Sequence, residues 1–197
     1  MMLKRSEGQE PYVEAPTPGD GALGVFFPKE VSLSIDKWRR VYLRQHGEIS
    51  SHITVAYPPF VRLEEWPSVR PAIVECLGRF DPFEVTLRNL GAFTGPPHVL
   101  WLKPEDGDQL SSIHTALAKR WANYVPAGRF DFVPHVTVGL FDTQEALSKA
   151  REAILAEIVP LCFRVDELSY VVRGDNGVWC VYEQLVLGSS SANALHR

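Results

Sequence analysis

Two strand-like segments of the 197-residue chain carry the same arrangement of residues. The first, SHITVAYPPF, contains His52 and Thr54, and the second, PHVTVGLF, contains His135 and Thr137, so that the histidines lie 83 positions apart. Each segment occupies the same place in a repeated order of expected elements, which is helix, strand, helix, strand, strand. A chain patterned in this way is predicted to form two similar α+β lobes, as after an old duplication.

Apolar periodicity and turn residues place the individual elements. Ile35, Trp38, Val41 and Tyr42 mark the buried face of the first expected helix, and the run 174–177 (GDNG) is a hairpin-turn signal. Helices are predicted over 31–45, 68–80, 110–121 and 143–158, with Ser68 and Thr143 as N-caps, and strands over 22–27, 52–57, 83–90, 99–103, 135–140, 163–173 and 178–187.

Composition excludes several classes of protein. The chain is 45% hydrophobic and 22% charged, which excludes general disorder, and its 20 basic against 24 acidic residues argue against a protein that coats long nucleic acid. Three cysteines without CxxC spacing disfavour a disulfide framework or a structural zinc site. No signal peptide or membrane-spanning stretch is apparent, so a cytoplasmic protein is expected. The protein is also expected to be a monomer. Residues 1–20 and 188–197 are predicted to be a flexible leader and tail around a single folded domain over 21–187.

The spacing of the two segments places polar groups side by side. Residues i and i+2 of a strand point to one face, so His52 and Thr54 share a face, as do His135 and Thr137. The intervening residues are apolar and are expected to face a core, while Ala56 and Gly139 leave open space beside the polar residues. This arrangement is typical of the floor of a cleft.

Two imidazoles and two hydroxyls in one cleft suit phosphate chemistry. Imidazole titrates near neutrality, so one ring can accept a proton while the other donates one. Threonine hydroxyls can donate hydrogen bonds to phosphate oxygens, whose negative charge grows in the transition state. The set fits in-line attack on a phosphodiester without a metal or other cofactor.

Three less specific interpretations compete. A single His-x-Thr strand is most often structural, and only the matched pair favours catalysis. A zinc site would need Asp131 or Asp142 as a further ligand. Arg173, before the hairpin turn, could add positive charge for a phosphate, although a solvated arginine is the simpler interpretation.

The segments His52-Ile53-Thr54 and Pro134-His135-Val136-Thr137 resemble the paired HxT/S motifs of the 2H phosphoesterase superfamily, in particular its bacterial and archaeal 2′-5′ RNA ligase family. The resemblance covers roughly residues 22–188 and includes 93–102 (FTGPPHVLWL) and 130–139 (FDFVPHVTVG). It implies a bilobal α+β fold, each lobe an antiparallel sheet with helices outside, and a central cleft that holds both motifs.

The resemblance also implies metal-independent hydrolysis of a 2′,3′-cyclic phosphate to a 2′-phosphate, with a small cyclic nucleotide or an RNA 3′ end as substrate. By analogy, His135 is the base that activates water, His52 is the acid that protonates the leaving 3′-oxygen, and Thr54 and Thr137 bind the phosphate. Some relatives cleave or join 2′,5′ linkages. Many ligase-type members carry a basic residue shortly after the second motif, whereas this chain continues Gly139-Leu140-Phe141.

The sequence therefore predicts a phosphoesterase of this type. The alternative from a different class is a module that binds nucleotides or RNA ends without significant turnover. A 2′,5′ RNA ligase or 2′,5′-phosphodiesterase activity is a further alternative.

Overall fold

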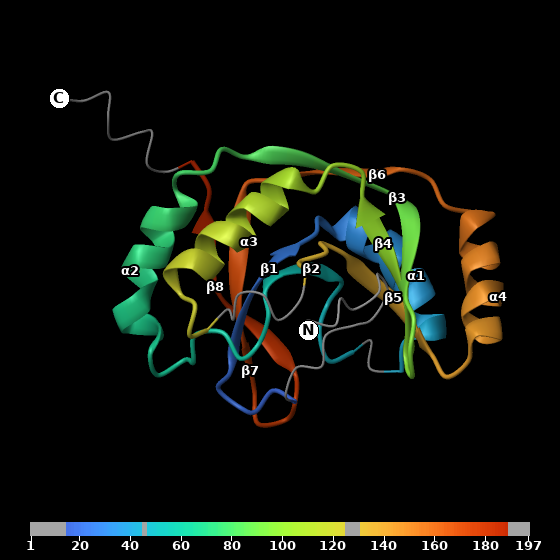
Figure 1. Ribbon diagram of the computed structural model, residues 1–197, viewed down its shortest axis with the longest axis horizontal. Coiled ribbons are helices and arrows are strands. Elements are labelled where there is room, and N and C mark those ends of the chain that lie inside the picture. The colour runs from blue at the N-terminus through green and yellow to red at the C-terminus, as the bar shows by residue number, and fades with distance from the viewer. Residues whose placement is uncertain (1–14, 45–46, 125–130, 189–197) are drawn as a thin grey trace, which may run out of the picture.

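The computed structural model describes residues 15–44, 47–124 and 131–188 of the chain (Figure 1). Along these residues the elements are β1 (Gly21–Phe26), α1 (Lys29–Tyr42), β2 (His52–Ala56), α2 (Trp66–Leu77), β3 (Phe83–Phe93), β4 (His98–Pro104), α3 (Asp108–Arg120), β5 (Val136–Phe141), α4 (Gln144–Leu155), β6 (Leu161–Val165), β7 (Glu167–Arg173) and β8 (Trp179–Val186).

The strands form two four-stranded antiparallel sheets, with the orders β2-β1-β7-β8 and β5-β4-β3-β6. In Figure 1, α2 and α3 lie on one side of the molecule and α1 and α4 on the other. The predicted α+β class, with two lobes that each contain an antiparallel sheet and outer helices, is confirmed. Within each sheet the strand that carries a His-x-Thr motif, β2 or β5, is an edge strand.

The two sheets do not correspond to the two halves of the sequence. Strands β3 and β4, expected in the first lobe, pair with β5 and β6, while β7 and β8 complete the sheet of β1 and β2. The strand expected over 163–173 is in fact two strands, which separate at Asp166: β6 pairs with β3 and β7 pairs with β1. A pattern of apolar residues reports that a segment is extended, but it does not report which neighbour completes its hydrogen bonds.

Two helices pack on the sheet of the opposite lobe. Helix α1 precedes β2 in the chain but packs against β5 and β6, and α3 precedes β5 but packs against β2. His114 of α3 donates from Nδ1 to the carbonyl oxygen of Val55 in β2, at 2.8 Å. Trp38 of α1 donates from Nε1 to the carboxylate of Glu157, which follows α4, at 2.5 Å. The lobes are thus held together by an exchange of helices and share one hydrophobic core.

The ends of the helices show one prediction confirmed and one wrong. Thr143 caps α4, because its Oγ1 accepts a hydrogen bond from the backbone N–H of Ala146 at 3.2 Å. Helix α2 begins at Trp66, two residues before the expected cap Ser68, whose hydroxyl instead donates to the carbonyl oxygen of Glu65 at 2.7 Å. The reason is Pro67, which suits the first turn of a helix because it lacks an N–H that would be unpaired there.

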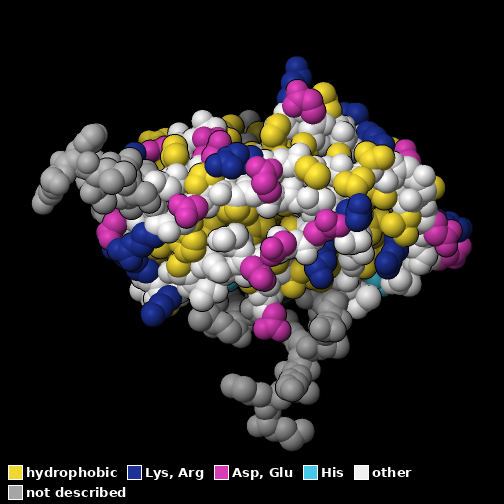
Figure 2. All heavy atoms as spheres, turned by 90° about the horizontal axis from the view of Figure 1, so that it is seen from above, with side chains coloured by type: hydrophobic (Ala, Val, Ile, Leu, Met, Phe, Trp, Pro, Cys, Tyr) yellow, Lys and Arg dark blue, Asp and Glu magenta, His cyan; other side chains and the backbone are white. Residues whose placement is uncertain are grey.

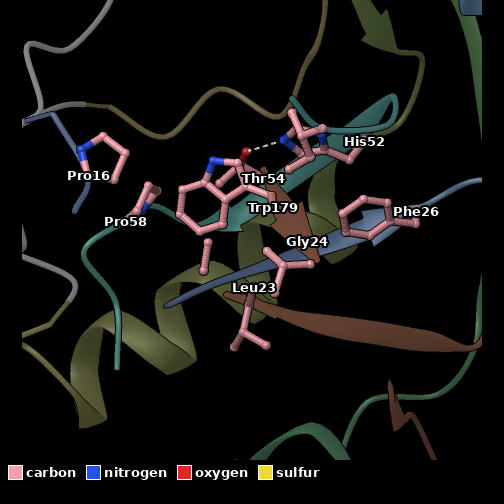
Figure 3. Close-up of a pocket in the computed structure, with 11 residues that line it drawn as sticks. Pro16, Leu23, Gly24, Phe26, His52, Thr54, Pro58 and Trp179 are labelled. Carbon is pink, nitrogen blue, oxygen red and sulfur yellow. Dashed lines mark hydrogen bonds between the residues drawn. The ribbon is translucent and has the colours of Figure 1, made fainter. Parts of the chain in front are cut away.

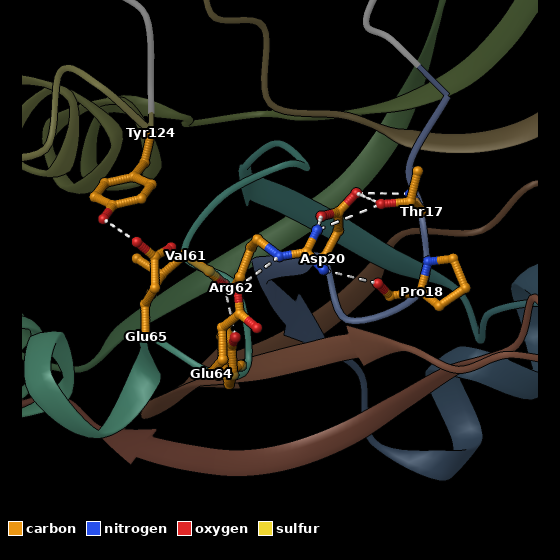
Figure 4. A network of polar contacts seen from close by, with 9 residues as sticks. Thr17, Pro18, Asp20, Val61, Arg62, Glu64, Glu65 and Tyr124 are labelled. Carbon is orange, nitrogen blue, oxygen red and sulfur yellow. Dashed lines mark hydrogen bonds and ion pairs between the residues drawn. The ribbon is translucent and has the colours of Figure 1, made fainter.

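The described fold begins earlier than residue 21. Asp20 is only 4% exposed, and its carboxylate accepts hydrogen bonds from the N–H and the hydroxyl of Thr17 at 2.6 and 2.9 Å (Figure 4). Arg62 forms an ion pair with the same carboxylate at 2.5 Å. Asp20, at the end of the stretch assigned to the flexible leader, is therefore buried and holds Thr17 and Arg62 by its carboxylate. Residues 1–14 of the expected leader and 189–197 of the expected tail lie outside the described residues.

Acidic and basic side chains are intermixed on the face of the molecule seen in Figure 2. None of the helices in the described ranges is long and apolar enough to cross a membrane.

Candidate active site

The two motif strands face each other and present their polar residues in the predicted way. Strands β2 and β5 are in contact. In β2, His52 and Thr54 are partly exposed, whereas Ile53 between them is fully buried. In β5, Thr137 is partly exposed between buried valines, and His135 directly precedes the strand. The alternation predicted from the sequence is confirmed at both motifs.

One cavity of about 200 Å³ brings the four predicted residues together. His52 and Thr54 reach it from one sheet and His135 and Thr137 from the other. The other residues that line it are Arg39, Leu43, Glu48, Ile49 and Trp179. The two motifs thus line a single site, although 83 residues separate the histidines.

Backbone carbonyls two residues upstream orient both imidazoles. Nδ1 of His52 lies 2.8 Å from the carbonyl oxygen of Ser50, and Nδ1 of His135 lies 2.7 Å from that of Val133. A carbonyl oxygen only accepts, so each Nδ1 carries the proton and each Nε2 is left for chemistry. Nε2 of His52 lies 3.1 Å from Oγ1 of Thr54, which donates to it when the ring is neutral. Within the described residues, Nε2 of His135 makes no hydrogen bond.

Aromatic side chains pack against both rings. The ring of Phe26 stacks on His52 with centroids 5.4 Å apart, and Phe93 meets His135 edge-on at 5.0 Å. Trp101 also contacts the His135 ring, at 5.7 Å. These contacts limit the rotation of the imidazoles, and they also displace water from them.

The pKa values of both histidines are lowered from the ordinary value of 6.5. Desolvation is the main cause at His52 and lowers its pKa to about 4, although the hydrogen bond to Ser50 opposes the shift. The positive charges of Arg39 and of protonated His135 lower the His52 pKa further. Desolvation also lowers the pKa of His135. Burial thus favours the neutral form of both imidazoles in the free protein at neutral pH.

The open space expected beside the motifs is filled. The β1–β2 register shifts between Thr54 and Ala56, and the β4–β5 register shifts between Thr137 and Gly139. Such a bulge ends the alternation and turns the following residue to the other face, so Ala56 and Gly139 are buried. A Cβ on Gly139 would lie 2.7 Å from Cβ of Tyr42. Gly139 thus admits helix α1 and not a ligand.

A second, more apolar pocket of about 180 Å³ adjoins the first (Figure 3). The two share His52, Thr54, Ile49 and Trp179. The residues that line only the second pocket are Pro16, Ala22, Leu23, Gly24, Phe26, Pro58 and Val171. The site therefore combines a polar part between the sheets with an apolar part along β1.

Sequence reasoning missed Arg39, although a signal for it was present. Val41 was assigned to the buried face of α1, but its side chain is 70% exposed, whereas Arg39 is 2% exposed. Arg39 follows Ile35 by four residues, and i and i+4 lie on the same helix face, whereas Val41 points away from it. Apolarity alone was used to assign the face, and the charged residue that shares it was overlooked.

The weaker candidates from the sequence do not reach the site. Arg173 does not line either pocket. Asp131 and Asp142, considered as zinc ligands, are exposed, and the described part of the chain contains no group of three or more His, Cys, Asp or Glu side chains placed to hold a metal ion. Trp179, which lines both pockets from β8, was not predicted as a site residue.

A family model and the sequences of known proteins point to the same kind of protein. The family model described as "2'-5' RNA ligase superfamily" matches residues 27–177. The "Putative phosphoesterase GK0864" of Geobacillus kaustophilus is 23% identical over 164 residues, which cover 83% of this chain and 94% of that protein. A protein of the same description from Bacillus licheniformis is 26% identical over 172 residues, 84% of this chain and 97% of that one.

Solved structures share the fold. The apo form of E. coli LigT matches with a TM-score of 0.59 at 20% identity and covers 86% of this chain and 98% of that one. TT0787 of Thermus thermophilus matches with a TM-score of 0.59 at 22% identity, over 85% and 97% of the two chains.

Proposed function

Because the chain belongs to the 2′-5′ RNA ligase superfamily, a group of 2H phosphoesterases, we propose that it hydrolyses a 2′,3′-cyclic phosphate to a 2′-phosphate. The observation that carries this proposal is the single cavity lined by His52, Thr54, His135 and Thr137, with Nδ1 of each imidazole held by a carbonyl. The substrate is a small cyclic nucleotide or an RNA 3′ end.

The two imidazoles would act at opposite ends of the reaction. Nε2 of His135 accepts a proton from water as the water oxygen bonds to phosphorus. The bond from phosphorus to the 3′-oxygen breaks, and Nε2 of protonated His52 donates its proton to that oxygen. Thr54 and Thr137 donate hydrogen bonds to the non-bridging oxygens. The product is a 2′-phosphate with a free 3′-hydroxyl, and the two rings then exchange protons with solvent.

Binding of an anion favours uptake by His52 of the proton that this ring lacks in the free protein. With a pKa of about 4, the His52 ring is neutral at pH 7. A negatively charged phosphate beside both rings favours their protonated forms and raises their pKa values. The phosphate charge therefore favours uptake of a proton from solvent by His52 as the substrate binds, and the mechanism requires that His135 stays neutral.

The ligands bound by a structural relative agree with a nucleotide substrate. LigT has been crystallised with 3′-AMP, with NADP+, with phosphate and with ATP. The pocket beside His52 has a mainly apolar lining that suits the uncharged part of such a molecule. A cytoplasmic location, a monomeric state and independence from metals stay predictions.

Turnover in the presence of a chelator tests the proposal directly. Purified protein incubated with 2′,3′-cyclic AMP and excess EDTA is expected to form 2′-AMP, measured by chromatography. The double variant His52→Ala/His135→Ala is the control for contaminating activity. Binding without turnover would instead favour the alternative of a binding module. Activity lost in EDTA and restored by zinc or manganese would contradict the paired-histidine mechanism.

The pH profile is expected to be displaced to acid pH. The base must be neutral and the acid protonated, so kcat/KM follows a bell whose two limbs lie at the lowered pKa values of the two histidines, one of which is the His52 pKa of about 4. Both limbs report the free enzyme and lie below pH 6.5. The kcat profile reports the complex, in which the phosphate raises both pKa values, and its optimum is expected at higher pH. A kcat/KM optimum above pH 6.5 would contradict the low pKa values.

A further inference from the structure

The cavity contains a buried cation that the motifs do not account for. Arg39 of α1 is 2% exposed and lines the cavity together with the histidines. Burying a guanidinium is costly unless its charge and its N–H groups find partners. The partners of the Arg39 guanidinium therefore show how much of its hydrogen-bonding capacity is left for a ligand.

The protein only partly satisfies this guanidinium. Nη2 donates to the carbonyl oxygen of Ile49 at 2.7 Å. Nε lies 3.5 Å from a carboxylate oxygen of Asp36, but it makes no hydrogen bond within the described residues. A guanidinium has five N–H donors in one plane, and such a fork matches the oxygens of a phosphate. Arg39 is thus a buried donor group with unused capacity at the wall of the site.

The charges around the cavity leave Arg39 as its source of positive charge. Both histidines are neutral in the free protein at pH 7. The remaining charged residue that lines the cavity is the carboxylate of Glu48, which is partly exposed. Asp36 carries a side chain that is 31% exposed and only partly offsets the guanidinium.

The residues that follow the second motif in β5 supply no further positive charge to the cavity. The residues that follow Thr137 are Val138, Gly139, Leu140 and Phe141, none of which is charged. Gly139 packs against Tyr42 of α1, and the rings of Tyr42 and Phe141 are 5.7 Å apart. Helix α1 therefore covers this stretch of β5, and the same helix carries Arg39 to the cavity.

We propose that Arg39, the buried cation that α1 brings to the cavity, binds the substrate phosphate. The inference rests on the proposed function, since it assigns a phosphate to the same cavity. The guanidinium donates to non-bridging phosphate oxygens and offsets the charge that develops on them. Because α1 packs on the sheet of the opposite lobe, Arg39 lies at the junction of the two motifs.

Binding of inorganic phosphate tests the assignment without requiring turnover. Arg39→Met is expected to weaken phosphate binding, measured by calorimetry, by roughly 10- to 100-fold, as for loss of a charged hydrogen-bond partner. Arg40→Met is the matched control, because Arg40 is the exposed neighbour in the same helix, and it is expected to bind within about twofold of the wild type. Arg39→Met that folds and binds phosphate like the wild type would overturn the proposal.

Asp36→Asn separates phosphate binding from a structural role, and it also decides the matter if Arg39→Met does not fold. This variant keeps the hydrogen bond from Arg39 to Ile49 but removes the competing carboxylate. Phosphate affinity is expected to rise by roughly two- to fivefold if the guanidinium binds the anion. Unchanged or lower affinity would show that Arg39 only supports Ile49. A wild-type protein that binds phosphate through Arg39 but hydrolyses no cyclic phosphate would count against the proposed function alone.

Discussion

His52→Ala and His135→Ala are each expected to lower kcat for a 2′,3′-cyclic nucleotide by roughly 10²- to 10⁴-fold, the range for loss of a general acid or base. Both rings line the same cavity and have Nδ1 held by a carbonyl, so each supplies one Nε2 to one phosphate. Because the two proton transfers accompany one displacement, the double variant is expected to be about as active as the less active of the two single variants. Steady-state kinetics of the three variants measures this.

His98→Ala is the matched control for these variants. His98 begins β4, accepts a hydrogen bond from the N–H of Gly95 at 3.3 Å and does not line the cavity. Its removal is expected to leave kcat within about twofold of the wild type. Effects of His52→Ala and His135→Ala that multiply in the double variant would mean that the two rings act in separate steps. Full activity in either single variant would remove that histidine from the mechanism.

Thr54→Val and Thr137→Val are each expected to lower kcat by roughly ten- to a thousandfold, as for loss of one transition-state donor. Valine keeps the branched shape that suits a strand and removes only the hydroxyl. The two variants are expected to differ in their pH dependence. Thr54 also donates to Nε2 of neutral His52 at 3.1 Å, so its loss raises the His52 pKa, whereas Thr137→Val changes the rate alone. Kinetics across pH distinguishes these effects.

Thr86→Val provides the corresponding control, because Thr86 is a partly exposed strand threonine in β3 that does not line the cavity. Its activity is expected to match that of the wild type. If both cavity variants kept full activity while the wild type cleaved the substrate, the hydroxyls would have no part in holding the phosphate.

The site was more predictable from the sequence than the fold around it, for a physical reason. The placement of His52 and Thr54 on one face follows from the two-residue repeat of a strand, which is a local property. Sheet membership depends on partners far along the chain, and the hydropathy of 163–173 does not report that its two parts, divided at Asp166, belong to different sheets. Gly139 appeared to leave space for a ligand because the bulge that turns it toward Tyr42 is a property of the β4–β5 pairing.

Arg39 shows a different limit. Its position four residues after Ile35 was visible in the sequence, but whether its side chain reaches the cavity depends on what helix α1 packs against. Helix α1 packs on the sheet of the opposite lobe, so a residue next to the first motif in sequence reaches the cavity with the second motif. No local pattern reports such an exchange, and the charge of the site had to be read from the structure.

The strand order of the two sheets also bears on the synthesis of the protein on the ribosome. The sheet of β3 to β6 is built from residues 83–165, a continuous stretch that can pair as soon as it emerges. The other sheet has β1 and β2 at the start of the described chain but needs β7, so roughly 110 residues are translated between Ala56 and Glu167. At about 5 to 20 residues per second, synthesis of these residues takes roughly 5 to 20 s, during which β1 can pair with β2 but not with β7. During that interval the open edge of β1, which carries no charged residue, is exposed to other nascent chains, so the yield of folded protein should depend on chaperones that cover this strand.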